Sequence, residues 1–326
     1  DLINFFDKYV IQDPFDYRRA SLTSLPQCPV GQGYHLTFDT KEETLFFTKG
    51  ETLYMYNIKE KLLRFVISQN IFLRYPIRAL VALPREKVSF ITEGAGLFRG
   101  SNKGIEKYKI EQGSICANHL SRLQDHLLLF AEKQYIGTIK LLTDNSGNHA
   151  MISQKWSTNS GKIQFLATGK EGDIFSLHAN NVIKLWNLEK FNTTQRLPHL
   201  KVPDKARIHC MASHPLVPMI ALAGKGSFIY FWDRRGTQTK EVITIPKHLI
   251  NSSHVTQLDF SPSGRHLIAT VNHIHPLGSF ERNMMIWDMK YLKKPLRKTS
   301  LNLSSFTVHS DGKIWFSDRE GLKTLG

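Results

Sequence analysis

A cluster of cations near the end of the chain is the group of residues best suited to binding another molecule. The segment from 290 to 298 contains five basic residues, Lys290, Lys293, Lys294, Arg297 and Lys298, with the aromatic Tyr291 among them. A second basic group consists of Arg234, Arg235 and Lys240. Arginine and lysine contact phosphate oxygens, and aromatic rings between them stack on bases. The two groups therefore predict a surface that binds a polyanion or an acidic partner.

These cations also allow a second interpretation. Outer strands of β-proteins carry charged side chains, above all lysine, that prevent unwanted pairing between strand edges. The same residues could thus form only a solvated rim.

Histidines are concentrated between residues 248 and 275, where they could be considered as metal ligands. They are His248, His254, His266, His273 and His275. Zinc sites use three or four nitrogen, sulfur or oxygen ligands, and no cysteine lies in this segment. We therefore expect a surface loop around His273 and His275, with no metal site and no cofactor.

The motifs of common catalytic sites are missing from the sequence. Asn159–Lys162 ends like a phosphate-binding loop but lacks the upstream glycine, so it cannot form the cradle of backbone N–H groups. There is no Gly-x-Ser-x-Gly motif. Ser, His and Asp residues occur throughout the chain, and they indicate a catalytic site only where their side chains are known to lie within hydrogen-bond distance of one another. The sequence thus predicts no catalytic residue and a protein that is not an enzyme.

The composition is that of a globular protein with an excess of basic residues. Of 326 residues, 41% are hydrophobic, and 43 Lys and Arg against 28 Asp and Glu give a net charge of +15. This charge favours a polyanionic neighbour, such as nucleic acid, an anionic membrane surface or an acidic protein segment. No apolar run approaches the roughly 18 residues of a membrane-spanning helix. The first residues lack the pattern of a signal peptide, and because the chain starts at Asp1 we expect it to be part of something longer.

The cysteines indicate the compartment. Cys28, Cys116 and Cys210 are scattered and odd in number, which argues against a disulfide framework or a zinc site. Free cysteines favour a reducing, intracellular compartment.

A short apolar phrase ending in Trp-Asn or Trp-Asp recurs at nearly constant spacing. The clearest copies are Val182–Asn187, Phe228–Asp233 and Met284–Asp288, weaker ones end near 57, 100 and 143, and a seventh ends at 326. A period of roughly 40–45 residues with this ending is typical of a propeller built from four-stranded blades. The sequence therefore predicts an all-β, seven-bladed β-propeller of four-stranded antiparallel blades over residues 31–326.

The last blade is one strand short, which suggests how the ring closes. Its strands begin near Ser304, and the chain ends after the third of them. An open ring would leave a strand edge unpaired, and the alternating segment Arg19–Leu25 could supply the fourth strand. We therefore expect residues 1–30 to form an N-terminal arm that includes the closing strand.

The beginning of this arm has apolar residues at helical spacing, Leu2, Phe6 and Tyr9. Pro14 ends any such helix. We expect this part to pack on the propeller; a hook for a partner is the alternative.

The phrases and their period resemble the WD-repeat family over about residues 20–326. In that family a His before the first strand, a Ser or Thr in the second, an Asp in the following turn and the Trp of the third form a hydrogen-bonded tetrad. The sixth blade offers His254, Thr270 and Trp287, but residues 271–282 occupy the place of the Asp turn. We expect structural roles for His254 and four tryptophans, and Trp186, Trp232 and Trp287 should be largely buried between blades. The fourth of these tryptophans is Trp315.

A propeller is a platform whose fold does not name its partner. The resemblance and the charge predict a non-catalytic scaffold subunit of an intracellular multiprotein assembly, nuclear rather than cytoplasmic, of the ribosome-biogenesis or chromatin type. Its partners would be other protein subunits, with RNA or DNA on the basic rim. The alternative is an adaptor in a trafficking-coat or ubiquitin-ligase complex that binds acidic protein or lipid partners.

Overall fold

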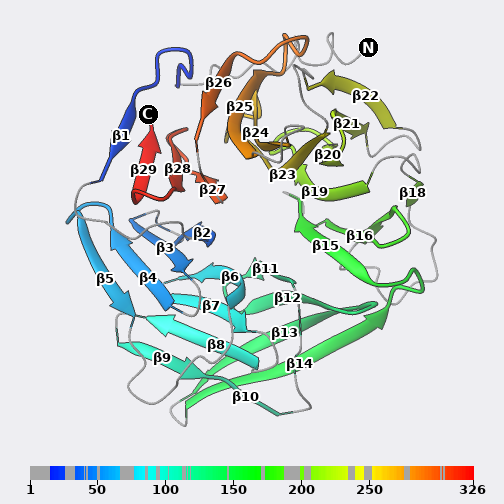
Figure 1. Ribbon diagram of the computed structural model, residues 1–326. Helices are drawn as coiled ribbons and strands as arrows, with labels where there is room; N and C mark the ends of the chain where they lie inside the picture. Colours follow the sequence, from blue (N-terminus) through cyan, green and yellow to red (C-terminus); the bar gives the residue numbers. More distant parts are fainter. Residues whose placement is uncertain are drawn as a thin grey trace.

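Short strands with alternating apolar residues are arranged around a central axis in the computed structural model (Figure 1). The structure describes residues 15–25, 34–39, 41, 43–49, 52–66, 77–84, 87–92, 96–101, 103–111, 115, 117, 119–144, 147–169, 173–186, 199–201, 207–233, 239–245, 252–274, 280–301, 303 and 305–326. Strands make up all the regular secondary structure of these residues. The fold is an all-β propeller with four-stranded antiparallel blades.

The first half of the chain forms four separate sheets in sequence order. The first contains β2 (Tyr34–Phe38), β3 (Thr44–Lys49), β4 (Thr52–Asn57) and β5 (Leu62–Val66). The second contains β6 (Ile77–Leu83), β7 (Lys87–Thr92), β8 (Gly96–Ser101) and β9 (Gly104–Lys107). The third contains β11 (His119–Gln124), β12 (Leu127–Glu132), β13 (Tyr135–Asp144) and β14 (Gly147–Ser157), to which β10 (Lys109–Ile110) adds a parallel fifth strand. The fourth contains β15 (Ile163–Thr168), β16 (Ile174–His178), β17 (Val182–Trp186) and β18 (His199–Lys201).

The second half differs from the prediction of separate blades. The four strands β19 (Arg207–Ser213), β20 (Met219–Lys225), β21 (Phe228–Asp233) and β22 (Thr239–Thr244) share one eight-stranded sheet with β23 (Ser252–Phe260), β24 (His266–Ile274), β25 (Phe280–Asp288) and β26 (Arg297–Ser300). A single bridge, Lys225 opposite His254, joins the two halves of this sheet. Five sheets therefore stand as separate blades where the sequence predicted seven. The strands β19–β22 and β23–β26 form one sheet because the end of β20 at Lys225 lies beside the beginning of β23 at His254.

The last sheet contains β27 (Ser305–Val308), β28 (Ile314–Ser317) and β29 (Leu322–Leu325), with β1 (Leu22–Ser24) at its outer edge. β1 pairs antiparallel with β29, with Leu22 opposite Leu325. Ser21 and Gly326 exchange two backbone hydrogen bonds, at 2.9 and 3.0 Å. This is the pairing on which the expected closure of the ring depends.

The residues before β1 also pack on the last sheet. Tyr17 is fully buried, and its hydroxyl donates a hydrogen bond to the Gly312 carbonyl at 2.6 Å. Its ring belongs to a core cluster with Ile286, Phe306 and Phe316. The predicted helical segment with Leu2, Phe6 and Tyr9 lies outside the described residues.

Within the described part of the chain, seven inner strands surround the axis of the ring. In order they are β2, β6, β11, β15, β19, β23 and β27, each in contact with the next, and β27 contacts β2. All of them begin at one face of the ring and end at the other, because they are the first strands of consecutive antiparallel units.

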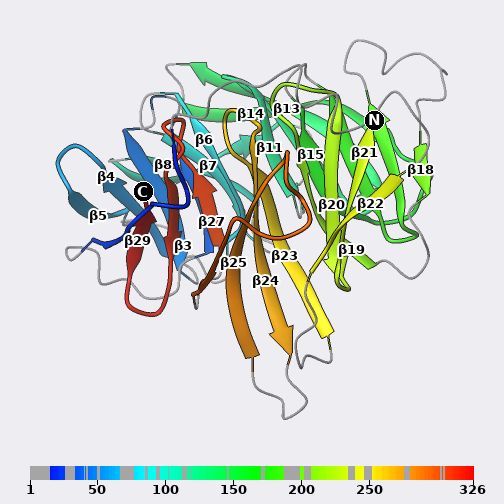
Figure 2. The same ribbon diagram turned by 90° about the horizontal axis from the view of Figure 1, so that it is seen from above.

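Residues 271–274 and 280–282, which occupy the place of the family's Asp turn, belong to strands. β24 and β25 remain paired as far as Ile274 and Phe280, and this hairpin extends beyond its neighbours (Figure 2). The alternation of side chains explains the extension, since Val271 and His273 are buried while Asn272 and Ile274 are partly exposed.

The tryptophans at the strand ends differ in their burial. Trp232 and Trp287 are fully buried, and Trp315 is 6% exposed. Trp232 packs with Phe175 of the preceding sheet. Trp186, in contrast, is partly exposed rather than largely buried. The outer strand β18 covers only Val182–Lys184, so it does not reach Trp186.

We expect Trp287→Ala to lower the free energy of unfolding by about 3–5 kcal/mol, because it removes a fully buried aromatic side chain. Trp186→Ala should cost only about 1–2 kcal/mol because part of its ring stays in solvent. Urea denaturation followed by circular dichroism measures both, with exposed Tyr291→Ala as the control. Equal costs for Trp287 and Tyr291 would contradict the packing described.

Candidate functional site

The predicted basic segment forms a turn between β25 and β26 that is held firmly at its base. The Asp288 carboxylate pairs with Arg265 at 3.2 Å and accepts the backbone N–H of Lys290 at 2.9 Å. The N–H of Met289 donates to the Arg265 carbonyl at 2.8 Å. These bonds fix the backbone at the start of the turn.

The side chains further along this turn face solvent. Lys293 and Lys294 are exposed, and Tyr291 is 69% exposed, while Leu292 packs against the core beneath. We call Tyr291, Lys293 and Lys294 the basic turn.

Two predicted members of the basic surface have other partners. Arg297 donates to the backbone carbonyls of Tyr17 and Ala20, and so fastens the N-terminal segment to β26. Lys298 lies 3.8 Å from the carboxylate of Glu281. Sequence reasoning grouped both with the basic turn because sequence spacing does not reveal which side of a strand meets another segment.

The structure does not show where the second predicted basic group, Arg234, Arg235 and Lys240, lies relative to the basic turn. Arg234 and Arg235 lie outside the described residues, as does the side chain of Lys240. Their proximity to the basic turn stays a prediction.

Arg297→Ala should lower the free energy of unfolding by about 1–3 kcal/mol, because the partly buried backbone carbonyls of Tyr17 and Ala20 would lose their charged hydrogen-bond donor. Lys298→Ala, at the next residue, should change it by less than about 0.5 kcal/mol because exposed ion pairs contribute little. Urea denaturation compares the two. A larger loss at Lys298 than at Arg297 would refute the structural role of Arg297.

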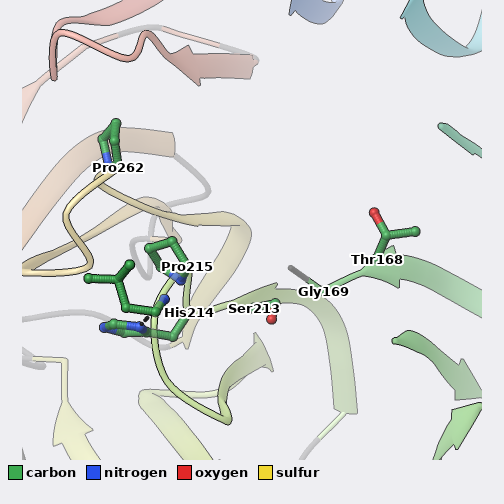
Figure 3. A pocket seen from close by; sticks show the side chains of 7 residues that line it. Thr168, Gly169, Ser213, His214, Pro215 and Pro262 are labelled. Carbon is green, nitrogen blue, oxygen red and sulfur yellow. Dashed lines mark hydrogen bonds between the residues drawn. The ribbon is translucent and has the colours of Figure 1, made fainter. Parts of the chain in front are cut away.

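An open pocket of about 510 Å³ lies among the turns that follow the inner strands. Thr168 ends β15 and Gly169 follows it, Ser213 ends β19 and His214–Leu216 follow it, and Pro262 lies in the turn after β23 (Figure 3). The contact between Met289 and Arg265 places the basic turn at the same end of its blade.

His214 is the titratable residue of this pocket, and both of its ring nitrogens are engaged. Nδ1 accepts the backbone N–H groups of Leu216 and Val217 at 3.1 and 3.2 Å, so Nε2 carries the proton and donates to the Gly264 carbonyl at 3.0 Å. Gly264 has a φ of +75°, and a Cβ there would lie 2.1 Å from the imidazole. Burial lowers the pKa of His214 to about 4. His214 therefore links two neighbouring turns as a neutral ring.

Stability should fall as the pH falls from about 6.5 towards 4. In this window an unfolded histidine binds a proton while folded His214 does not, so protons favour the unfolded state. At the low end the effect of His214 is on the order of 2–3 kcal/mol. Unfolding free energies at neutral and acidic pH should show a smaller pH dependence for His214→Asn. An equal pH dependence of the free energy of unfolding in the wild type and in His214→Asn would contradict a lowered pKa of His214 in the folded protein.

The opposite ends of the inner strands share a feature that sequence analysis missed. Pairing with the second strand skips Arg78 in β6, Gln164 in β15, His209 in β19 and Thr256 in β23, and each of these residues is exposed. In β2 the interruption includes His35, whose φ is 52°. Such bulges redirect side chains out of the sheet. The signal in the sequence is a polar residue near the start of each inner strand.

Four histidines lie near the beginnings of inner strands, in two pairs: His35 with His119, and His209 with His254. His35 acts electrostatically on His119 although β6 lies between their strands. Burial lowers the pKa of His119 to about 4, while a hydrogen bond to the backbone of Gln164 on β15 opposes the shift. The pKa values of His35, His209 and His254 are lowered as well, mainly because surrounding residues displace part of the water around each ring, although the side chains of His35 and His209 remain accessible to solvent.

Four cations lie beside these imidazoles, Arg78, Lys162, Arg207 and Lys225. Arg78 further lowers the pKa of His35, and Lys162 that of His119. Lys225 acts on both His209 and His254, and Arg207 on His209. We call the four imidazoles and four cations the axial cluster. It includes His254, for which the sequence predicted a purely structural role.

Of the tetrad residues that the sixth blade offers, Thr270 has another threonine as its hydroxyl partner. Thr270 Oγ1 lies 2.8 Å from Thr256 Oγ1. A related network occurs instead in the fourth sheet, where Trp186 Nε1 donates to Ser176 Oγ and Ser176 Oγ contacts His178 Nε2, both at 2.8 Å. Ser176 and His178 share one face of β16 because they are two residues apart.

The described residues contain neither a metal-binding group of side chains nor a helix that could span a membrane. No group of three or more His, Cys, Asp or Glu side chains in them could hold a metal ion. The expected surface loop is wrong for His273, which is buried in β24 with Nδ1 3.2 Å from Ser253 Oγ. His275 lies outside the described residues. None of the described segments forms a helix with the length and apolarity for membrane crossing.

No protein-family model and no curated protein matches this sequence. Among solved structures, the chain is similar to a streptogramin B lyase, with a TM-score of 0.65 over 96% of this chain and 99% of that one. The two sequences are 14% identical. This likeness shows the propeller fold alone.

Proposed function

We propose that this protein is a non-catalytic, WD-type propeller that serves as a scaffold subunit in an intracellular assembly, in the nucleus and close to nucleic acid. The basic turn is its contact for a polyanionic partner. The observation that carries this proposal is the combination of a fixed backbone at Asp288 with exposed side chains at Lys293 and Lys294. Because the backbone at the base of the turn is already fixed, less conformational entropy is lost when Lys293 and Lys294 bind a partner.

The proposed ring has seven blades. Counting the two halves of the eight-stranded sheet separately gives this number, and the cycle of contacts among the inner strands supports it. In this interpretation, β1 closes the ring by completing the last blade. The hydrogen bond from Trp186 in the third strand to Ser176 in the second resembles part of the WD-repeat tetrad, whereas His178 lies in the second strand and not before the first.

Two other functions compete with this proposal. An adaptor that binds an acidic protein segment would use the same basic turn, since carboxylates and phosphates both pair with lysine. An enzyme is the other competitor, because the similar solved structure has the name of a lyase. The hydrogen bonds of His214 argue against catalysis at the pocket, because neither ring nitrogen is available to a substrate.

The double variant Lys293→Glu, Lys294→Glu should weaken binding to single-stranded RNA roughly tenfold or more and lower the salt slope by about 2, because it removes two phosphate contacts. Fluorescence anisotropy across a salt series measures both. Lys103→Glu, Lys109→Glu makes the same charge change at exposed positions of other sheets and should retain the wild-type slope.

The outcomes separate the candidates. Equal losses in both double variants would mean that total charge, not this surface, determines binding. If RNA does not bind while affinity purification loses protein partners only in the Lys293, Lys294 variant, the adaptor function replaces the scaffold near nucleic acid. Turnover of a substrate at the pocket would refute the non-catalytic assignment.

A further inference from the structure

A row of polar residues crosses the eight-stranded sheet from β19 to β25. Arg207 lies directly opposite Lys225, and Lys225 lies directly opposite His254. The row continues to Asn272 on β24 and Arg282 on β25, each opposite the residue before it. Residues directly opposite each other in antiparallel strands direct their side chains to the same face of the sheet. We call Arg207, Lys225, His254, Asn272 and Arg282 the cross-strand row.

The cross-strand row is accessible to solvent along its length. Arg207 and Lys225 are exposed, and the other three residues are partly exposed. The hairpin of β24 and β25 extends beyond its neighbours at this end (Figure 2). A ligand on this face of the sheet therefore reaches all five side chains.

Two glycines allow β19 and β23 to approach β20 closely at Lys225. Gly224 lies against the backbone of Arg207, and a Cβ there would lie 1.9 Å from the Arg207 carbonyl oxygen. Gly226 has a φ of +130°, a conformation that glycine adopts without strain, and its N–H donates to the Ser253 carbonyl at 2.9 Å. The row is thus built into the junction between the two halves of the sheet.

The row carries positive charge that no carboxylate neutralises within the described part of the chain. The side chains of Arg207 and Lys225 form no ion pair and no hydrogen bond with another described residue. Partial desolvation lowers the pKa of His254, and the charge of Lys225 lowers it further. Arg282 donates one hydrogen bond to the Leu303 carbonyl at 3.3 Å, and its guanidinium has further N–H donors.

We propose that the cross-strand row binds an extended acidic segment of another protein. Neighbouring strands lie about 4.8 Å apart, so the row spans about 19 Å from Arg207 to Arg282. An extended peptide advances about 3.3 Å per residue, and about six residues cover this length. Every second side chain of such a peptide faces the same side, so three or four carboxylates, about 6.6 Å apart, meet the row.

The chemistry of the row suits carboxylates better than a nucleic-acid strand. The arginine at each end binds a carboxylate through two N–H groups at once. Proteins that bind single-stranded nucleic acid stack its bases on aromatic side chains. In the described part of the chain the exposed aromatic side chain is Tyr291, which belongs to the basic turn and not to the row.

The cross-strand row is a different surface from the basic turn. Arg282 lies near the beginning of β25, whereas the basic turn follows the end of this strand at Asp288. The strand between them is roughly 20 Å long. Variants at one surface therefore leave the side chains of the other in place.

Fluorescence anisotropy with a labelled peptide of about eight glutamates at low salt tests the proposal. Arg207→Gln with Lys225→Gln should weaken peptide binding at least about tenfold, because two charge-assisted contacts are lost. Lys103→Gln with Lys109→Gln removes the same charge from exposed positions of other sheets and should change the affinity by less than about twofold. Circular dichroism verifies that both variants are folded.

Asn272→Lys is a second test, whose expected result a folding defect does not imitate. It adds a cation in the middle of the row and should tighten peptide binding about threefold or more. Gln154→Lys adds the same charge at an exposed position of β14 and should leave the affinity within about twofold of the wild type.

Four outcomes would overturn the proposal. The first is absence of peptide binding, and the second is an equal loss in the two double variants. The third is unchanged or weaker peptide binding by Asn272→Lys. The fourth is an RNA of about eight uridines that binds more tightly than the peptide and loses affinity in the Arg207, Lys225 variant, because the row would then recognise nucleic acid.

The variant Lys293→Gln, Lys294→Gln separates this proposal from the scaffold function assigned to the basic turn. It should bind the glutamate peptide within about twofold of the wild type, because the row is intact. A larger loss of peptide affinity there than in the Arg207, Lys225 variant would place the acidic segment on the basic turn and so refute the row as its site.

Discussion

The structure depends on the burial of both faces of every blade. A four-stranded antiparallel sheet whose two faces are apolar needs a neighbour on each side, because exposed apolar area is unfavourable in water. Trp232 meets this need by packing on the preceding sheet with Phe175. The same requirement applies at the two ends of the chain, where β1 pairs with β29 and Tyr17 enters the core. Residues almost 300 positions apart in the chain are thereby held together, as the Tyr17–Gly312 hydrogen bond illustrates.

The two faces of the ring follow from this arrangement and differ in chemistry. At the ends of the inner strands, neighbouring turns are tied to each other, as His214 is to Gly264. The basic turn extends from this rigid side. At the beginnings of the same strands, bulges expose polar side chains near the axis. The cations of the chain therefore differ in their surroundings, because Lys293 and Lys294 extend from a turn at one face while Arg207 and Lys225 lie near the beginnings of the inner strands at the other.

Not every cation in a basic sequence is available to a partner. Arg297 illustrates this, because its guanidinium holds the carbonyls of Tyr17 and Ala20. Lys293, four residues earlier, faces solvent. The difference arises from a segment nearly the whole chain away, which local sequence does not reveal.

The sequence by itself determined the all-β propeller architecture, since the period of the Trp-Asp phrases and the alternation of apolar residues are local patterns that strands require. It also located the strand that pairs with β29 and the burial of Trp232 and Trp287. Only the tertiary structure decided the continuous eight-stranded sheet, the partial exposure of Trp186 and the extended hairpin of β24 and β25. The same holds for the electrostatic effect of His35 on His119, because their strands come near each other only when the inner strands surround one axis. Periodicity records which face of a strand is apolar, whereas contacts between distant strands depend on the geometry of the whole ring.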